Sequence, residues 1–202
     1  MIPAFEDAVF DGKIGKYSED DIPNPINVYA STKLESEIIV NKVITNGCIL
    51  RTNHYGWNAL DRYCLAEWML DKLEKKNELP AFKDIIFSPI LINNLANALI
   101  ELYEMRYKGI IHIAARDSCT KLDFAYDLAE VFKLDRTLVV PTLSENVKLL
   151  AKRSKNMSLC TNKAKKMLKT KLLDVKHSIE EFKKLRDSEY VKNLKKMANL
   201  NL

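Results

Sequence analysis

The chain has 202 residues, of which 47% are hydrophobic and 29% are charged, and its formal net charge is +5. This composition is sufficient for a buried core and excludes a disordered chain, while the lack of an apolar run of about 18 residues argues against a transmembrane helix. The first residues are acidic and are not followed by a long apolar stretch, so they do not resemble a signal peptide, and we expect a single-domain cytoplasmic protein.

The first elements along the chain predict a short strand followed by an extended segment. Val9 and Phe10 are expected to end the strand, and a turn follows at Asp11-Gly12. Gly12 and Gly15 lack the strand, glycine-rich turn and helix of a dinucleotide-binding motif, and the chain has five glycines in all. The two prolines in residues 23–25 predict an extended lead-in to the next helix.

That helix is predicted over about Ser31–Thr45, with Asn27 or Ser31 as its cap. Tyr29 and Lys33 are four residues apart, so they lie on one helix face. A neighbouring ammonium lowers the pKa of a tyrosine, and such a tyrosine can exchange a proton with a substrate oxygen. The spacing alone is weak evidence for function, because it is more typical of a surface pair on an amphipathic helix.

A buried parallel strand is predicted at residues 48–52, after a left-handed cap at Gly47. The loop at residues 53–58 follows the carboxyl end of this strand, which is where open α/β sheets bind ligands. The alternative interpretation is a packed loop in which Tyr55 and Trp57 anchor the following helix.

The remaining pattern alternates helices and strands. Strands are expected at 85–87, 110–115 and 137–140, and helices at 60–76, 90–106 (capped by Asn93), 120–133, 144–151, 161–168 and 177–185. His112 lies within an apolar strand and is interpreted as a core residue. The four cysteines are widely spaced without a Cys-x-x-Cys pair, so we expect free thiols, no metal site, and a core position for Cys48.

The positive charge is concentrated from Lys148 onward, where acidic residues are interleaved with the lysines. Such a segment is able to attract nucleic acid or a phosphorylated ligand. Solvated helix faces explain it better than nucleic-acid binding, because no aromatic platform or zinc finger accompanies it. We therefore expect no nucleic-acid partner and no membrane partner.

An ordered series of motifs covers nearly the whole chain and resembles the dTDP-4-dehydrorhamnose reductases, a family of extended short-chain dehydrogenases/reductases. The motifs are Val9-Phe10-Asp11-Gly12, Tyr17-x-Glu19-x-Asp21-x-Pro23-x-Pro25, Asn27-x-Tyr29-x-x-x-Lys33-x-x-x-Glu37, Leu50-Arg51-Thr52, Phe87-Ser88-Pro89, Gly109-Ile110-Ile111-His112-Ile113-Ala114, Lys121-x-x-Phe124-Ala125 and Arg153-x-x-Asn156-x-Ser158-Leu159.

The resemblance implies a nicotinamide cofactor, NADP or NAD, and a nucleotide-sugar substrate. It makes Tyr29 the general acid that protonates the reduced carbonyl, and makes Lys33 the residue that lowers its pKa and binds the nicotinamide ribose. Thr52 is implied as a further cofactor contact. The implied substrate contacts are Asn53, His54, Trp57 and Arg153.

The chain departs from the family pattern in three respects. The glycine-rich strand and helix that hold the dinucleotide, and several strands after them, are not in the 202 residues. Glu6 stands near the position of the family's catalytic serine or threonine, and Asn94 and Cys160 stand where aspartates are common. We therefore expect an α/β fold that contains the last strands of a truncated Rossmann-like parallel sheet and a mostly helical substrate-binding subdomain. Residues 1–58 would form the catalytic helix and part of the sheet. Residues 59–202 would form the sugar-nucleotide-binding part and add one more strand to the sheet near 109–115.

Two functions follow from this resemblance. One is a nucleotide-sugar reductase that is inactive alone because the cofactor-binding half is missing. The other is a non-catalytic sugar-nucleotide-binding or regulatory module of the same fold, and a gene remnant is a third possibility. Because parallel sheets are normally covered on both faces, we expect an exposed edge and face that a second polypeptide or self-association covers.

Overall fold

The computed structural model describes residues 4–44, 47–60, 63–147 and 151–199. Its central sheet is parallel and has the order β1-β2-β7, formed by Ala4–Glu6, Cys48–Thr52 and Gly109–His112. Ala4 lies opposite Leu50, and Leu50 lies opposite Ile111. The carboxyl ends of the three strands therefore meet at one edge of the sheet, as the order of helices and strands predicts.

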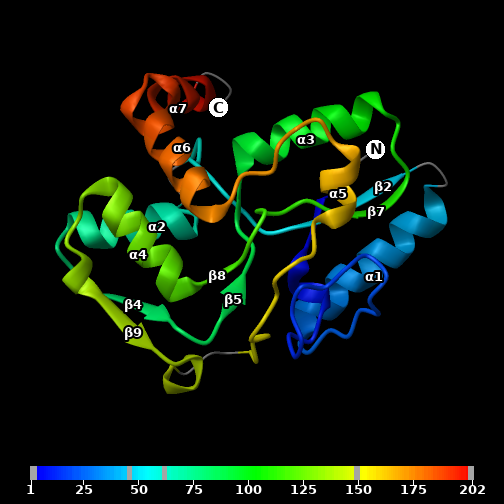
Figure 1. Cartoon of the computed structure of the whole chain (residues 1–202), viewed down its shortest axis with the longest axis horizontal. Coiled ribbons are helices and arrows are strands. Elements are labelled where there is room, and N and C mark those ends of the chain that lie inside the picture. Colours follow the sequence, from blue (N-terminus) through cyan, green and yellow to red (C-terminus); the bar gives the residue numbers. More distant parts are fainter. Residues whose placement is uncertain (1–3, 45–46, 61–62, 148–150, 200–202) are drawn as a thin grey trace.

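Helices cover both faces of this sheet (Figure 1). α1 (Val28–Val43) lies on one face, and α3 (Ile92–Glu104) and α5 (Asn162–Met167) lie on the other. Alternation along β2 decides which side chains meet which helix, because successive strand residues point to opposite faces. Cys48 and Leu50 pack in the core with α3 and α5, whereas Arg51 points toward α1.

A second core lies beside the sheet and is mostly helical (left in Figure 1). Its helices are α2 (Leu65–Glu74), α4 (Lys121–Phe132) and α6 (Val175–Asp187), followed by α7 (Tyr190–Asn199). Short strand pairs border it: β4 (Leu79–Phe82) with β9 (Val139–Thr142), β5 (Ile86–Phe87) with β8 (Cys119–Thr120), and β3 (His54–Tyr55) with β6 (Ile90–Leu91). Three 3₁₀ turns complete the described elements: η1 (Asp7–Val9), η2 (Arg136–Leu138) and η3 (Ser144–Asn146).

Residues 152–158, which we call the strap, join the two parts. The Ser154 hydroxyl donates to the Phe10 carbonyl at 2.9 Å, and the Ile86 amide donates to the Lys155 carbonyl at 2.8 Å. Gly12 has a φ of +75°, and the strap passes so close to it that a Cβ on Gly12 would lie 2.6 Å from Ser154 Cβ. A glycine is therefore required at this crossing.

Several predicted boundaries are corrected by the structure. The first strand ends at Glu6, and Val9 belongs to a 3₁₀ turn rather than to a strand. Gly47 does not adopt the predicted left-handed conformation, because α1 has already ended at its C-cap Ile44. Leu91, not Asn93, caps α3, since the helix starts directly after β6.

Other elements differ in extent. The predicted helix 144–151 is a 3₁₀ turn at Ser144–Asn146, and its residues 148–150 lie outside the described part of the chain. Thr45, the predicted end of the helix that carries Tyr29, and the following Asn46 also lie outside the described part. β3, β4, β8 and α7 were not predicted. The five residues of the central strand β2 are all buried, while the expected exposure of a sheet edge and face stays a prediction. Exposed apolar side chains occur on α1, where Val28 is 81%, Ile39 60% and Val43 75% exposed.

Candidate active site at the carboxyl edge of the sheet

Two polar side chains meet where β1 and β2 end. Asp7 follows β1, Asn53 follows β2, and the Asn53 amide donates to Asp7 Oδ2 at 3.0 Å. Asp7 is almost completely buried although it is ionisable. A buried carboxylate at the ligand-binding edge of a parallel sheet identifies this edge as the candidate site.

The predicted tyrosine and lysine lie together at the start of α1. Asn27 caps the helix by accepting a hydrogen bond from the Ala30 amide at 2.8 Å, which confirms one of the two predicted caps. Lys33 Nζ lies 5.3 Å from the centre of the Tyr29 ring. The Tyr29 side chain is 48% exposed, so its ring is accessible to a ligand. The prediction that the two residues share one helix face is confirmed.

A buried ion pair anchors this helix to the sheet. Arg51 donates to Glu37 through Nε at 3.0 Å and through Nη2 at 2.7 Å, and the two side chains are only 2% and 4% exposed. Glu37 lies one turn after Lys33, so the pair fixes the helix that carries Tyr29. Two-point guanidinium–carboxylate contacts restrict orientation as well as distance.

His112 lies next to this ion pair at the end of β7. Its ring is fully buried, with Nδ1 3.0 Å from the Tyr17 carbonyl and Nε2 3.5 Å from Arg51 Nη1. Burial and the nearby Arg51 charge lower the pKa of His112 to about 4. The ring is therefore neutral near pH 7, donates from Nδ1 to Tyr17, and belongs to the core, as the sequence predicts.

Thr52 is the last residue of β2 and is almost completely buried. The Thr52 Oγ1 atom is buried and forms no hydrogen bond within the part of the chain that is described. Buried hydroxyls are normally paired, so this atom is available to a ligand at the sheet edge.

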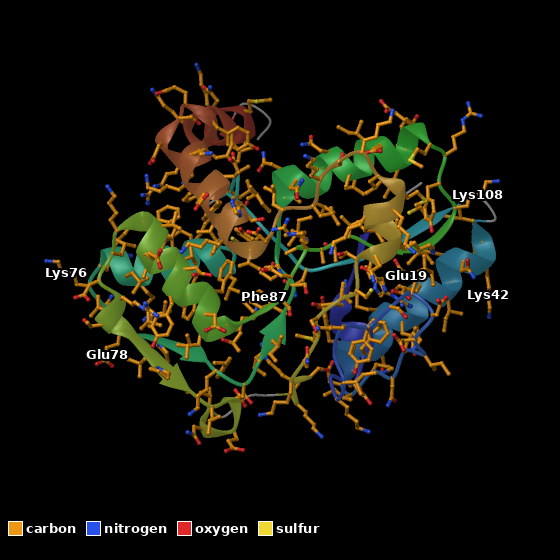
Figure 2. The ribbon with its side chains drawn as sticks, viewed as in Figure 1. Glu19, Lys42, Lys76, Glu78, Phe87 and Lys108 are labelled. Carbon is orange, nitrogen blue, oxygen red and sulfur yellow. The ribbon has the colours of Figure 1, made fainter. Side chains whose placement is uncertain are left out.

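Lys121 brings a positive charge close to the same edge. It is the first residue of α4, and its ammonium lies over the Phe87 ring, 3.3 Å from the ring centre. Phe87 is buried in the second core, near the middle of the molecule as seen in Figure 2. Burial lowers the pKa of Lys121 to about 8; the Asp7 charge opposes this shift and the Arg153 charge adds to it.

Arg153 is exposed and projects from the strap. The strap holds it near the start of α1, because Asn27 Nδ2 donates to the Lys152 carbonyl at 2.9 Å. Asn27 is therefore shared between the helix cap and the strap. Within the described residues, Arg153 has neither a hydrogen bond nor an ion pair.

The loop after β2 divides between the two parts of the molecule. Asn53 faces Asp7, and His54 is exposed in β3. The Trp57 ring instead stacks on Phe182, with ring centres 4.2 Å apart, and its indole N–H donates to the Phe182 carbonyl at 2.9 Å. Trp57 thus packs against α6, within a core that also contains residues of α2, the helix that follows the loop.

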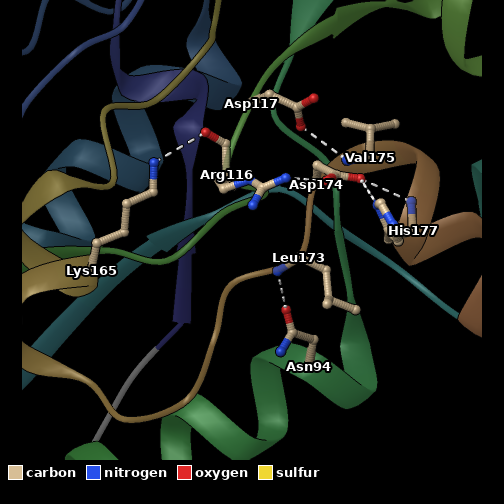
Figure 3. Close-up of polar contacts among 8 residues, drawn as sticks. All are labelled: Asn94, Arg116, Asp117, Lys165, Leu173, Asp174, Val175 and His177. Carbon is tan, nitrogen blue, oxygen red and sulfur yellow. Dashed lines mark hydrogen bonds and ion pairs between the residues drawn. The ribbon is translucent and has the colours of Figure 1, made fainter.

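The Asn94 side chain binds the backbone of the segment between α5 and α6. Its amide oxygen accepts from the Leu173 amide at 3.0 Å (Figure 3). Its nitrogen donates to the Lys171 carbonyl at 3.1 Å. Asp117 holds the same connection by accepting from the Val175 amide at 2.9 Å. The amide at position 94 therefore fixes the segment between α5 and α6.

Sequence reasoning missed Asp7 and Lys121 as site residues. In the sequence, Asp7 is only the residue after Glu6, in the segment that lacks the family's catalytic serine or threonine. Lys121 is only the first residue of the motif Lys121-x-x-Phe124-Ala125. The capping box that Thr120 and Asp123 form predicts where α4 starts, but nothing in the sequence indicates that Lys121 turns onto Phe87.

The residues fit only one end of a nicotinamide dinucleotide. Tyr29, Lys33 and Thr52 offer hydroxyl and ammonium groups suited to a ribose. The turns at Gly12 and Gly15 are filled by the strap, since a Cβ on Gly15 would lie 2.1 Å from Asn156 Nδ2. They are therefore packing glycines and do not form a pyrophosphate cradle.

The described residues offer neither a metal site of clustered side chains nor a membrane-spanning helix. They contain no group of three or more His, Cys, Asp or Glu side chains arranged to hold a metal ion. Among them there is also no helix with the length and apolar character needed to cross a bilayer.

Comparison with known sequences supports the reductase resemblance. The chain is 33% identical over 137 residues to a probable low-salt glycan biosynthesis reductase, Agl14, of Haloferax volcanii, covering 66% of this chain and 46% of the relative. It is 28% identical over 182 residues to methionine adenosyltransferase 2 subunit beta of Rattus norvegicus, covering 81% of this chain and 51% of the relative. The chain thus spans about half the length of these curated relatives.

Solved structures agree with the fold. A dTDP-4-dehydrorhamnose reductase of Clostridium acetobutylicum matches with a TM-score of 0.85 and 25% identity, over 93% of this chain and 66% of that chain. One from Bacillus anthracis in complex with NADP has a TM-score of 0.82 and 23% identity, over 90% and 64%. The family model described as RmlD substrate binding domain matches residues 2–187. The chain therefore belongs to the RmlD substrate-binding domain family and has the Rossmann-like α/β fold of the dTDP-4-dehydrorhamnose reductases.

Proposed function

We propose that the chain forms the substrate-binding and proton-donating part of an NAD(P)H-dependent nucleotide-sugar reductase of the dTDP-4-dehydrorhamnose reductase type, which acts in deoxysugar or polysaccharide precursor synthesis. The observation that carries the proposal is the Tyr29–Lys33 pair, placed at the start of the anchored helix α1 in a chain that the family model matches over residues 2–187. Support also comes from the buried, unpaired Thr52 hydroxyl at the sheet edge.

In this proposal each residue has a defined task. The Tyr29 hydroxyl donates a proton to the carbonyl oxygen of the sugar, and the Lys33 ammonium stabilises the tyrosinate that remains. Asn53, His54, Trp57 and Arg153 contribute to the nucleotide-sugar pocket, with Trp57 acting through the position of the loop because its indole N–H is already used. A bound nicotinamide cofactor supplies the hydride.

We further propose that these 202 residues alone bind the nucleotide-sugar but do not turn it over. The pyrophosphate of the cofactor needs backbone N–H groups at a glycine-rich turn, and the turns at Gly12 and Gly15 are filled. The dinucleotide would be held by a segment outside these residues, in the same protein or in a second polypeptide, with self-association as the alternative. The exposed apolar residues of α1 support such a covering partner.

A non-catalytic role is the second candidate. It is favoured by the similarity to a subunit of methionine adenosyltransferase, and by Glu6 at the end of β1, near the position of the family's hydroxyl residue. In that case the chain would bind a sugar nucleotide or a protein partner without reducing anything.

Titration of the purified chain with NADPH, followed by nicotinamide fluorescence with and without a dTDP-sugar, tests the proposal. Binding of the dTDP-sugar without saturable NADPH binding is the expected result. Saturable NADPH binding at micromolar concentration would contradict the requirement for a further segment, and reduction should then be lost in Tyr29→Phe and retained in Tyr63→Phe, which changes an exposed tyrosine on another segment. If no dTDP-sugar binds, the reductase proposal fails.

A further inference from the structure

The Asn27 side chain joins two segments that are far apart in the sequence. Its Oδ1 atom accepts a hydrogen bond from the Ala30 amide at 2.8 Å, which caps α1. Its Nδ2 atom donates to the Lys152 carbonyl of the strap at 2.9 Å. Aspartate and serine cap helices equally well, but an ionised aspartate has no donor and serine has one oxygen for both tasks. An asparagine at this position therefore does more than a cap requires.

The two contacts of Asn27 with the start of α1 enclose Tyr29. The first amides of a helix have no acceptor within the helix, so the position of its first turn depends on the cap. The bond from the Ala30 amide to Asn27 Oδ1 spans Tyr29. The Ser31 amide also donates to the Asn27 carbonyl, at 3.0 Å, and closes the same turn. Asn27 therefore fixes the backbone that carries the Tyr29 ring.

The strap that Asn27 binds is held by both parts of the molecule. On the side of the sheet, the Ser154 hydroxyl donates to the Phe10 carbonyl at 2.9 Å. On the side of the second core, the Met157 amide donates to the Ile86 carbonyl of β5 at 2.9 Å. The bond from Asn27 extends this set of contacts to the start of α1. The strap and the first turn of α1 are therefore held as one unit.

We infer that Asn27 is a positioning residue for Tyr29: it fixes the proton donor relative to the strap, and so relative to a nucleotide-sugar that lies against the strap. The inference rests on the proposed function, which places Arg153, the residue after Lys152, in the nucleotide-sugar pocket. Glu37 anchors the middle of α1 to the sheet, whereas Asn27 fixes the end that carries Tyr29. Two segments ordered in advance bind a ligand more tightly, because the ligand does not have to order them itself.

Three substitutions at Asn27 separate capping from the contact with the strap. Asn27→Asp and Asn27→Ser keep an oxygen that caps the helix and remove the amide donor to the Lys152 carbonyl, whereas Asn27→Ala removes both. Because Asn27→Asp adds a charge and Asn27→Ser does not, equal effects of the two identify the lost donor as the cause. The matched control Asn24→Ser removes an amide donor that binds Asp11 Oδ2, at 3.1 Å, rather than the strap.

Two measurements compare these chains. Calorimetric titration with dTDP-glucose gives the affinity, and nuclear magnetic resonance of chains isotopically labelled at the tyrosine Cζ atoms reports on the Tyr29 ring, whose signal is the one missing from Tyr29→Phe. In the unchanged chain and in Asn24→Ser, dTDP-glucose should shift this signal. In Asn27→Asp and Asn27→Ser the affinity should fall about fivefold and the shift should be lost, because the ligand must then order both segments itself. Their thermal stability should stay close to that of the unchanged chain, since the cap remains.

A role in capping alone gives a different pattern. Asn27→Asp and Asn27→Ser would then bind dTDP-glucose like the unchanged chain, with the same shift of the Tyr29 signal, and only Asn27→Ala would lose affinity and thermal stability. That result overturns the inference and leaves the proposed function in place.

Three other results also decide the matter. The inference is wrong if dTDP-glucose binds to the unchanged chain without shifting the Tyr29 signal. It is equally wrong if Asn27→Asp and Asn27→Ser differ in their effects or fail to fold, because both retain the cap. If the unchanged chain binds no dTDP-glucose, the proposed function fails, and the inference fails with it.

Discussion

Removing the carboxylate of Glu37 should be among the most damaging single changes in the sheet half of the molecule. Glu37→Gln keeps the size of the side chain but leaves the Arg51 guanidinium without its countercharge at a site where it is 2% exposed. Removing one partner of a buried ion pair costs about 3–5 kcal/mol. Since domains of this size are stable by about 5–15 kcal/mol, the loss is a large part of the total.

Urea denaturation followed by tryptophan fluorescence and far-UV circular dichroism measures this loss as a change in the free energy of unfolding. Glu130→Gln is the matched control, because Lys176–Glu130 has the same 2.7 Å distance as Arg51–Glu37 but both side chains are about half exposed. That control should leave the free energy of unfolding almost unchanged.

A double change distinguishes an unpaired charge from lost packing. Glu37→Leu combined with Arg51→Met replaces both partners by apolar side chains of similar size, and should recover most of the stability that Glu37→Gln loses. The reasoning is refuted if Glu37→Gln costs less than about 1 kcal/mol, or if the double variant is less stable than Glu37→Gln.

Three further predictions concern the framework around the site. The pKa of His112 is about 4 in the folded chain and 6.5 ordinarily, so between pH 6.5 and pH 4 the unfolded chain binds a proton that the folded chain does not, and about 3 kcal/mol of stability is lost as the pH falls. Urea denaturation across this pH range should show a flatter pH dependence in His112→Asn but not in His177→Asn. Gly12→Ala should lower the melting temperature more than Gly109→Ala, because both have positive φ but only the first Cβ meets atoms closer than 3 Å; equal losses would contradict the crossing of the strap. Trp57→Phe keeps the ring stacking and loses the indole hydrogen bond, so it should cost about 1 kcal/mol in chemical denaturation, and a neutral result would show that this bond is unimportant.

The sequence predicts those parts of the fold that depend on local pattern. The apolar run at residues 48–52 gave the buried strand β2, and the spacing of Tyr29 and Lys33 gave their shared face, because both follow from the periodicity of one element. The parallel order of the sheet follows from the alternation of helices and strands.

The rest depends on contacts between distant segments, which no local pattern encodes. The strap approaches Gly12 from more than 140 residues away, and Lys121 meets the Phe87 ring only because β8 pairs antiparallel with β5. For the same reason Trp57, although it lies in a loop typical of ligand binding, packs against Phe182 in the second core. Strands of two to four residues, such as β3 and β8, are too short for their periodicity to be visible.

Hydrogen exchange measured by mass spectrometry, with and without saturating dTDP-glucose, tests the central claim most directly, because it reports where the ligand binds. We expect slower exchange at the amides that surround the carboxyl edge of the sheet and the strap: residues 8–12, 52–54, 85–88, 119–122 and 152–156. The helices α2 and α7 should exchange unchanged. Protection confined to α2 or α7, or no protection anywhere at saturating ligand, would contradict a nucleotide-sugar site at this edge.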